Sequence, residues 1–248
     1  MKAKYGGVFM LLVSDLDTIL KECENSDNKT VDRLYTFMKN DLFMVCTDRN
    51  VLEAIKKLEK YDIPVDYIST GNGSHLFDRN LNCLEQKCFS TSFIRELEPL
   101  NQEPFVSNIS YHAAWEYPNR KVGMREVSSI QASFKKRDFD SSYLDIWEKY
   151  FSSNASIVSK KVQDDIVSYV VKPKNISRKT SIKYLEKNVP LLRKEVLIDP
   201  RGFDSLDEFE EYQIIPIHEE NTLEDSNSYS SLSEFLKDYS KYNRQKRR

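Results

Sequence analysis

The N-terminal part of the chain alternates short apolar runs with amphipathic segments, and this alternation restricts the possible folds most strongly. Residues 8–14 and 42–46 are continuously apolar, as expected of strands buried on both faces of a sheet. Residues 30–39 and 49–60 carry apolar side chains at helical spacing. Residues 63–68 form a third strand-like run. Strands that alternate with helices predict a parallel sheet with crossover helices.

The pattern changes in the middle of the chain and returns near its end. Helix-like and strand-like segments are mixed in the middle, at 91–99, 122–134, 143–151, 155–162 and 165–172. The first pattern resumes with a helix that starts near Ser177, strands at 196–199 and 213–217, and a closing helix at 231–242. The sequence thus predicts an α/β protein. Residues 1–80 and 173–248 are expected to form a Rossmann-like three-layer core with a parallel sheet, and residues 81–172 an inserted α+β domain.

Composition excludes several classes of protein. The chain has 248 residues, of which 40% are hydrophobic and 31% charged, which is typical of a globular protein. The net charge of −2 indicates no general attraction to nucleic acid. No apolar run approaches the ~18 residues that a membrane-spanning helix needs, and the four cysteines lack metal-type pairing. We therefore expect a cytoplasmic monomer or homodimer without a nucleic-acid or membrane partner.

Acidic and hydroxyl residues follow the expected strands at the points where the strands end. Asp15 and Asp17 follow the first strand, Thr47 and Asp48 the second, and Asp199 a later one. The carboxyl ends of parallel strands meet at one edge of a sheet, which is where ligands bind in such folds. Carboxylates that gather there repel one another unless a cation is bound, and Mg2+ prefers oxygen ligands beside a phosphate.

Two carboxylates and a phosphate allow a defined chemistry. One carboxylate can attack phosphorus to form an aspartyl-phosphate, and the other can protonate the leaving oxygen and then activate water. Because residues i and i+2 of an extended chain point the same way, Asp15 and Asp17 are expected to face one phosphate. The hydroxyl of Thr47 and a cation, either Arg178 or Lys179, would hold the phosphoryl oxygens.

The order of these motifs resembles the haloacid dehalogenase superfamily. The stretches that carry the resemblance are LLVSDLD at 11–17, DYISTGNGSHLFD at 66–78 and VVKPKNISRKTSIKYLEK at 170–187. The insertion lies between the second and third motifs, which is similar to the subgroup with a large α+β cap. That subgroup includes Cof-like sugar phosphatases, sucrose-phosphate-phosphatase-like proteins and, more distantly, phosphomannomutase of the eukaryotic type. The resemblance implies that residues 81–172 are a cap domain.

The resemblance also implies a role for individual residues. Asp15 would be the nucleophile and a Mg2+ ligand, and Asp17 the general acid and base whose backbone carbonyl binds the metal. Thr47 and Arg178 would bind phosphate. Asp199 and Asp204 would complete the Mg2+ site.

Four further residues are candidates for substrate contacts. Asn72 lies in a Gly-Asn-Gly turn that is expected near the hinge of the cap. The other three are cations that suit a phosphate or sugar-phosphate substrate: Arg49, Lys179 and Arg125. Cap residues Trp115, Tyr117, Arg120 and Lys121 are candidates of the same kind, although the two aromatic residues suit the cap's own core equally well.

Four departures from the family pattern keep the alternatives open. Thr18-Ile19 stands after the first motif where Gly-Thr is usual, and Asp48 adds an acid beside Thr47. Arg178 stands where the family has Lys, and an arginine is a wider donor than a compact ammonium. The fourth motif, residues 198–204, is one residue longer, lacks its Asn and contains Pro200.

The leading hypothesis is a Mg2+-dependent phosphatase that acts on a small phosphorylated metabolite, such as a sugar phosphate, through an aspartyl-phosphate. One alternative is phosphomannomutase-like phosphoryl transfer, because residues 122–130 (VGMREVSSI) loosely resemble that family's cap. The other is a degenerate member that binds a ligand or protein partner without turnover, because the second to fourth motifs are altered.

Overall fold

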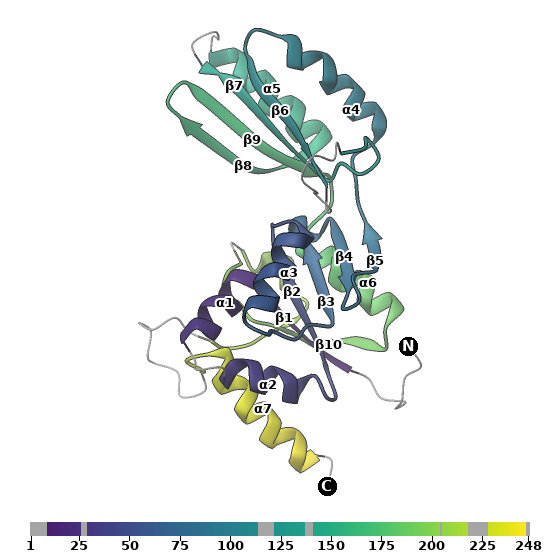
Figure 1. The fold of residues 1–248 in the computed structure, drawn as a ribbon, viewed down its shortest axis with the longest axis vertical. Helices are drawn as coiled ribbons and strands as arrows, with labels where there is room; N and C mark the ends of the chain where they lie inside the picture. The colour runs from purple at the N-terminus through teal and green to yellow at the C-terminus, as the bar shows by residue number, and fades with distance from the viewer. Residues whose placement is uncertain are drawn as a thin grey trace.

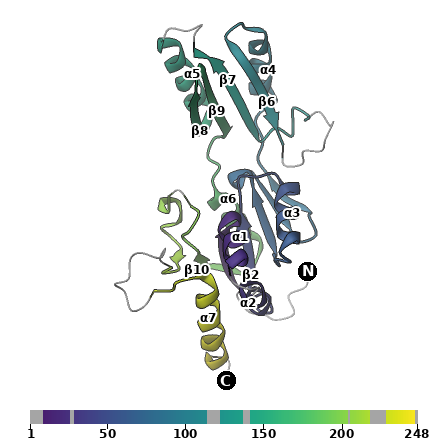
Figure 2. The same cartoon turned by 60° about the vertical axis from the view of Figure 1, so that its left-hand side comes forward.

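The computed structural model describes residues 9–25, 29–113, 122–136, 141–203, 205–217 and 228–246, and it contains two separate sheets (Figure 1). A seven-stranded sheet has the order β11-β10-β1-β2-β3-β4-β5, and a four-stranded sheet the order β6-β7-β9-β8. Figure 2 shows that the chain passes between the two parts twice, once after β5 and once after β9. One part is therefore inserted into the other.

The seven-stranded sheet is parallel in its centre and antiparallel at one side. Its parallel strands are β1 (Phe9–Asp15), β2 (Leu42–Cys46), β3 (Tyr67–Thr70), β10 (Leu191–Ile198) and β11 (Gln213–Ile214). The strands β4 (His75–Asp78) and β5 (Cys83–Gln86) run antiparallel. The predicted parallel sheet is therefore confirmed for the central strands, and β4 and β5 add an antiparallel side. Only a 3-10 turn, η1 (Gly71–Gly73), joins β3 to β4, and a connection this short forces an antiparallel return.

Helices cover both faces of this sheet, which confirms the predicted three-layer α/β core. One face packs against α1 (Leu16–Asn25), α2 (Lys29–Phe37), α3 (Val51–Lys60) and α7 (Leu232–Lys246). The other face packs against α6 (Arg178–Asn188) and the 3-10 turn η4 (Asp207–Phe209). In β1, Leu12 enters the first layer, whereas Leu11 and Val13 enter the second. Side chains alternate along a strand, so the continuous apolar run supplies both layers.

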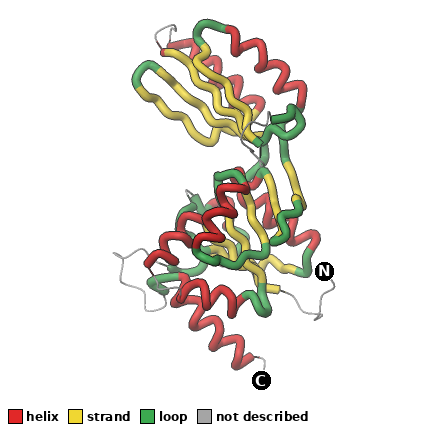
Figure 3. The backbone as a smooth tube through the Cα atoms, viewed as in Figure 1, coloured by secondary structure: helices red, strands yellow, loops and turns green. Residues whose placement is uncertain are grey.

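The inserted part is a four-stranded antiparallel sheet with helices on one face (Figure 3). Its strands are β6 (Val106–His112), β7 (Ser129–Lys135), β8 (Ala155–Gln163) and β9 (Ile166–Pro173). The helices α4 (Thr91–Leu97) and α5 (Ser141–Asn154) share a core with these strands, and the 3-10 turn η2 (Glu98–Gln102) follows α4. Phe134, Phe151 and Tyr169 are fully buried in that core. This is the expected α+β insertion.

Several local predictions differ from the structure. The strand predicted over 122–134 begins only at Ser129, and residues 124–126 form a turn instead. The strands β4, β5 and β6 were not predicted from the sequence. The strand β5 belongs to the seven-stranded sheet, although residues 81–172 were expected to form the cap. We propose that the cap begins after Lys87, whose N–H still donates to Ser74 O, and before Phe89, whose N–H donates to Val127 O.

No helix among the described residues is both long and apolar enough to cross a lipid bilayer. The expected location in the cytoplasm and the expected monomer or homodimer stay predictions.

The C-terminal helix α7 closes the core on the side of α2, and Figures 1 and 2 both show the two helices side by side. Leu232 and Leu236 are buried in the first layer. The rings of Phe37 and Tyr239 meet at 5.1 Å between centroids, and Arg33 donates to Ser233 O at 2.6 Å. Helix α7 is thus part of the core and not an appended tail.

We expect the substitution Leu236→Ala to lower the free energy of unfolding by about 2–4 kcal/mol, because it leaves a cavity under α7. The exposed neighbour Lys237 provides the control, since Lys237→Ala should change the free energy by less than about 0.5 kcal/mol. Urea unfolding of both variants measures the difference. Equal stability of the two variants would show that α7 does not contribute to the core.

Candidate active site

Asp15 lies at the carboxyl edge of the seven-stranded sheet, where β1 ends. Only 8% of the residue is exposed. Its Oδ1 accepts a hydrogen bond from the N–H of Thr18 at 3.2 Å, and its Oδ2 lies 3.7 Å from Nη2 of Arg178. Burial raises the pKa of Asp15, while the Thr18 N–H and the charge of Arg178 oppose that rise. The carboxylate is therefore enclosed, with a guanidinium as its close counter-charge.

Arg178 is held in place from three sides. Ser177 and Thr180 form a capping box that starts α6 directly at Arg178. The guanidinium donates from Nε to Asn72 Oδ1 and from Nη1 to Gly202 O, both at 3.2 Å. It also lies 4.8 Å above the ring centroid of Phe203. The structure thus brings the predicted residues Asn72, Arg178 and Asp15 together.

Asp17 does not follow Asp15 on an extended chain, so that part of the prediction was wrong. Helix α1 begins at Leu16, and Asp17 occupies its first turn. The N-terminal turn of a helix favours an acidic residue, and Asp17 sits there at a surface position. Nη2 of Arg49 donates to both carboxylate oxygens, at 2.9 and 3.0 Å, and Nζ of Lys57 lies 3.9 Å away. Asp17 is thus an ion-paired, half-exposed group.

Thr47 lies just beyond the end of β2, beside the end of β1. It is buried, and its backbone is fixed because its N–H donates to Ser69 O and its carbonyl accepts from the N–H of Asn72. Its Oγ1 accepts from the N–H of Arg49 at 3.2 Å. A hydroxyl oxygen that accepts can still donate its hydrogen to a ligand.

The remaining predicted residues lie elsewhere. Nζ of Lys179 contacts Glu211 at 2.6 Å and lies over the ring of Tyr212, so Lys179 serves the outer layer of the core. Arg125 is exposed in the turn before β7. Asp204 lies outside the described residues, as do the cap candidates Trp115, Tyr117, Arg120 and Lys121.

Lys172 is a nearby cation that the sequence analysis missed. Its Nζ donates to Asn72 O at 3.4 Å from the end of β9. Burial lowers its pKa, Glu208 raises it, and the charge of Arg178 lowers it further. A cavity of about 270 Å3 borders Lys172, Arg178 and Asn72. A lysine directly before the proline that ends a strand was the only sequence signal for this position.

Asp199 is paired with Arg201 beyond the end of β10. It is fully buried beyond β10, where Arg201 donates from Nε to Oδ1 and from Nη2 to Oδ2, both at 2.9 Å. The hydroxyl of Ser14 also donates to Oδ2 at 2.9 Å. Ser14 and Asp15 are consecutive in β1 and point to opposite faces. The carboxylate of Asp199 therefore faces away from that of Asp15.

The described residues do not fit a Mg2+ ion at this edge. No group of three or more His, Cys, Asp or Glu side chains among them is arranged to hold a metal ion. Both oxygens of Asp199 already accept hydrogen bonds from a cation, and that cation would repel a second one. The described residues therefore do not support one Mg2+ shared by Asp15 and Asp199, and the full expected set, which includes Asp17 and Asp204, stays a prediction.

Gly202 closes over Asp15 from the loop that follows Asp199. Its φ is +75°, and a Cβ at this position would lie 2.3 Å from Thr18 Oγ1 and 2.7 Å from Asp15 Cβ. Only a residue without a side chain allows the loop backbone to come this close. Glycine is therefore required at position 202 of the altered fourth motif for a steric reason.

A second cavity lies beside Thr47, between the start of α3 and the ends of β6 and β7. Its volume is about 220 Å3, and its lining includes Arg49, Thr70 and His75. Within the described part of the chain, Nε of Arg49, Oγ1 of Thr70 and both ring nitrogens of His75 are buried without a hydrogen-bond partner. Burial lowers the pKa of His75 to about 4, which keeps its imidazole neutral. Buried polar atoms without partners are rare, so these atoms are candidates for contact with a polar ligand.

We expect Gly202→Ala to lower the free energy of unfolding by about 1–3 kcal/mol, because the new methyl group requires a strained φ and displaces Thr18 or Asp15. Urea unfolding measures the change. Gly123→Ala is the matched control, since its Cβ would meet only the flexible end of Glu126 at 3.2 Å. A Gly202→Ala chain as stable as the Gly123→Ala chain would contradict the close packing on Asp15.

We also expect His75 to make stability depend on pH. Its folded pKa of about 4 lies below the ordinary value of 6.5, so the unfolded chain binds a proton more readily. The stabilisation is complete above pH ~6.5 and is lost as the pH falls toward 4, by about 2 kcal/mol between pH 7 and pH 5. His75→Gln should lack this component in urea unfolding at the two pH values, whereas His112→Gln should retain it. An unchanged pH dependence in His75→Gln would refute the assignment.

Comparison with known structures identifies the fold. TM0651 from Thermotoga maritima aligns with a TM-score of 0.64 at 13% identity over 93% of this chain and 97% of that protein. BT1666 from Bacteroides thetaiotaomicron, described as a phosphatase of the haloacid dehalogenase superfamily, aligns with a TM-score of 0.60 at 13% identity over 98% of both chains. The subclass IIB sugar phosphatase BT4131 aligns with a TM-score of 0.51 at 13% identity over 76% of this chain and 79% of its own.

At these identities the structural matches establish a shared fold, and the family assignment comes from the sequence. No curated protein matches the chain significantly. The sequence profile of the haloacid dehalogenase-like hydrolases matches residues 12–196, a span from β1 through the inserted part to β10. This agrees with the resemblance seen in the motifs. The chain belongs to the haloacid dehalogenase-like hydrolases.

Proposed function

We propose that the chain hydrolyses the phosphate monoester of a small hydroxylated metabolite, such as a sugar phosphate, with Asp15 as the nucleophile. The observation that carries this proposal is the enclosed carboxylate of Asp15, with the guanidinium of Arg178 at 3.7 Å and the Thr47 strand end beside it. A buried carboxylate with a positioned cation at the carboxyl edge of the sheet suits attack on a phosphoryl group.

The reaction proceeds in two steps on the residues of this chain. An oxygen of Asp15 forms a bond to phosphorus as the ester P–O bond breaks, and the leaving alkoxide takes up a proton. Water then attacks the aspartyl-phosphate, gives up a proton, and releases inorganic phosphate with the Asp15 carboxylate restored. Asp17 is the candidate acid and base for both proton transfers. Its ion pair with Arg49 must open for these transfers, because Arg49 holds both carboxylate oxygens.

Cations and hydrogen-bond donors of the chain bind the phosphoryl group. Arg178 is fixed by Asn72 and Gly202 and presents its charge to Asp15. Lys172 borders the same cavity, and Thr47 offers a hydroxyl hydrogen. Donors held in place in this way stabilise the charge that develops on phosphoryl oxygens. Since the described residues do not fit Mg2+, no step is assigned to a metal.

The polar cavity next to Thr47 supports a hydroxylated substrate. A neutral imidazole offers one donor and one acceptor, the Thr70 hydroxyl offers both, and Nε of Arg49 offers a donor. Hydroxyl groups of a polyol or sugar both donate and accept and so match this mixed set, whereas an anion could use only the donors of the set. The fold shared with BT4131, which is named a sugar phosphatase, agrees with this substrate class.

A second candidate function is binding of a phosphorylated ligand without turnover. Two observations favour it: Gly202 packs directly against Asp15, and the carboxylate of Asp17 is held by Arg49. An enzyme needs both carboxylates to reach the phosphate, whereas a binding protein needs only Arg178 and its neighbours. The described residues add no separate support for the phosphomannomutase-like alternative.

The decisive experiment is a panel of phosphate monoesters, with phosphate release and calorimetric binding measured in parallel. For the enzyme we expect Asp15→Asn to lower turnover by about 1,000-fold or more, because no covalent intermediate can form. Asp62→Asn, an exposed aspartate in a remote turn with a φ of 53°, is the matched control and should retain full activity. Undiminished turnover in Asp15→Asn would end the proposal.

The same panel separates the second candidate. Binding of an ester to the natural chain without any phosphate release would favour ligand binding, and Arg178→Gln should then weaken that binding. Release that Asp15→Asn abolishes would instead favour the hydrolase.

A further inference from the structure

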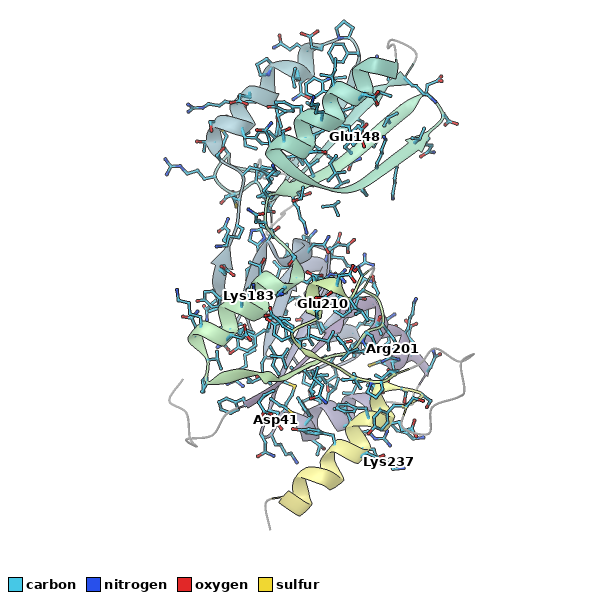
Figure 4. All side chains as sticks on the ribbon, turned by 180° about the vertical axis from the view of Figure 1, so that it is seen from behind. Asp41, Glu148, Lys183, Arg201, Glu210 and Lys237 are labelled. Atoms are coloured by element: carbon cyan, nitrogen blue, oxygen red, sulfur yellow. The ribbon has the colours of Figure 1, made fainter. Side chains whose placement is uncertain are left out.

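We propose that the guanidinium of Arg201 takes the place of a divalent cation as the counter-charge of the buried acids behind the active edge. The carboxylates concerned are those of Asp199 and Glu22. This inference goes beyond the proposed function and does not depend on it, because it concerns what binds these acids and not whether Asp15 turns over an ester. Figure 4 labels Arg201 in the core, between the cap and the end of α7 that carries Lys237.

Every carboxylate oxygen of Asp199 and Glu22 already accepts hydrogen bonds. Asp199 accepts two side-chain bonds from Arg201, one from the Arg201 N–H at 3.3 Å and one from Ser14. On Glu22, Oε2 accepts from Nη2 of Arg201 at 2.7 Å and from the N–H of Leu232 at 3.2 Å. Oε1 accepts from the N–H of Ser233 at 2.7 Å and from Thr30 Oγ1 at 3.3 Å. No oxygen is left to coordinate an ion.

The charges in this cluster are also compensated without a metal. The two acids carry two negative charges, Arg201 carries one positive charge, and the N-terminus of α7 adds a partial positive charge at Glu22. Asp199 is fully buried and the Arg201 side chain is 16% exposed, so removing one partner would leave an uncompensated buried charge. A divalent ion could enter only by displacing Arg201 from both carboxylates.

The guanidinium has a further effect that an exchangeable ion would not have. It ties the loop after β10, which carries Gly202 over Asp15, to α1 through Glu22 and hence to the start of α7. The position of that loop is therefore set by a covalent part of the chain. This connection does not require a bound divalent ion.

The experiment is a titration of the full chain with Mn2+, followed by the electron paramagnetic resonance signal of the free ion, with no substrate present. We expect no Mn2+ binding at this cluster in the natural chain. Arg201→Ala should bind Mn2+ at least about ten-fold more tightly than the natural chain does anywhere, since two carboxylates are released. Adding Asp199→Asn to Arg201→Ala should remove the gained site. Because ester turnover is not measured, failure here is distinct from failure of the proposed hydrolase.

Arg33→Ala is the matched control. Arg33 also contacts the start of α7, through the carbonyl and hydroxyl of Ser233, but it does not touch Asp199. Its loss should loosen α7 without creating a metal site. If Arg201→Ala proves unstable, Mn2+ should raise its thermal unfolding midpoint and leave that of the natural chain unchanged.

Two results would overturn the inference. One is Mn2+ binding by the natural chain that Asp199→Asn abolishes. The other is an Arg201→Ala chain that neither binds Mn2+ nor gains thermal stability from it.

Discussion

Parallel pairing of β1 between β10 and β2 is the constraint on which the site depends. The register places Val13 beside Ile198 and Asp15 beside Cys46, so that three strands end at nearly the same level. The N–H of Asp199 donates to Val13 O and extends this pairing past the end of β10. Without that register, the loops that carry Thr47, Gly202 and Asp15 would not meet. The same strands separate the two apolar layers, so the fold and the site rest on one set of backbone bonds.

Three acids near this edge each lie beside an arginine. Asp15 faces Arg178, Asp17 holds Arg49, and Asp199 binds Arg201. The acids were expected to share one Mg2+, because their mutual repulsion requires a positive charge nearby. Among the described residues, three guanidinium groups on different segments supply positive charge to these acids. A guanidinium also donates several directed hydrogen bonds, so these pairs fix the loops as well as the charge.

The enclosure of Asp15 and the polar cavity lined by Thr70 and His75 favour different functions. Close packing by Gly202 restricts access to the carboxylate, which favours binding over turnover. The buried atoms of Thr70 and His75 without partners, among the residues that the structure describes, indicate a site still complementary to a polar ligand. The phosphorylated, hydroxylated ligand proposed above would contact both groups of residues. Membership of the hydrolase family predicts hydrolysis. Substitution of Asp15 or Arg178, which lie 3.7 Å apart, tests that prediction.

Much of the layered core and part of the site could be predicted from the sequence, because local patterns carry that information. The apolar run before Asp15, the periodic spacing in α3 and the capping residue Ser177 each act within a few neighbours. Asp17 was not predicted to be helical, because the start of α1 at Leu16 depends on how that helix packs. The strand β5 was not predicted, because it is defined by its hydrogen bonds to β4 and not by its own composition.

The residue types at the strand ends can be read from the sequence, and they already imply that acids and cations gather at one edge of the sheet. Which cation pairs with which acid depends on the packing of distant segments. Arg201 and Glu22 are far apart along the chain, and their contact exists because the loop after β10, helix α1 and the start of α7 pack together. Pairing of charges across such separations follows from burial and packing, which no local pattern encodes.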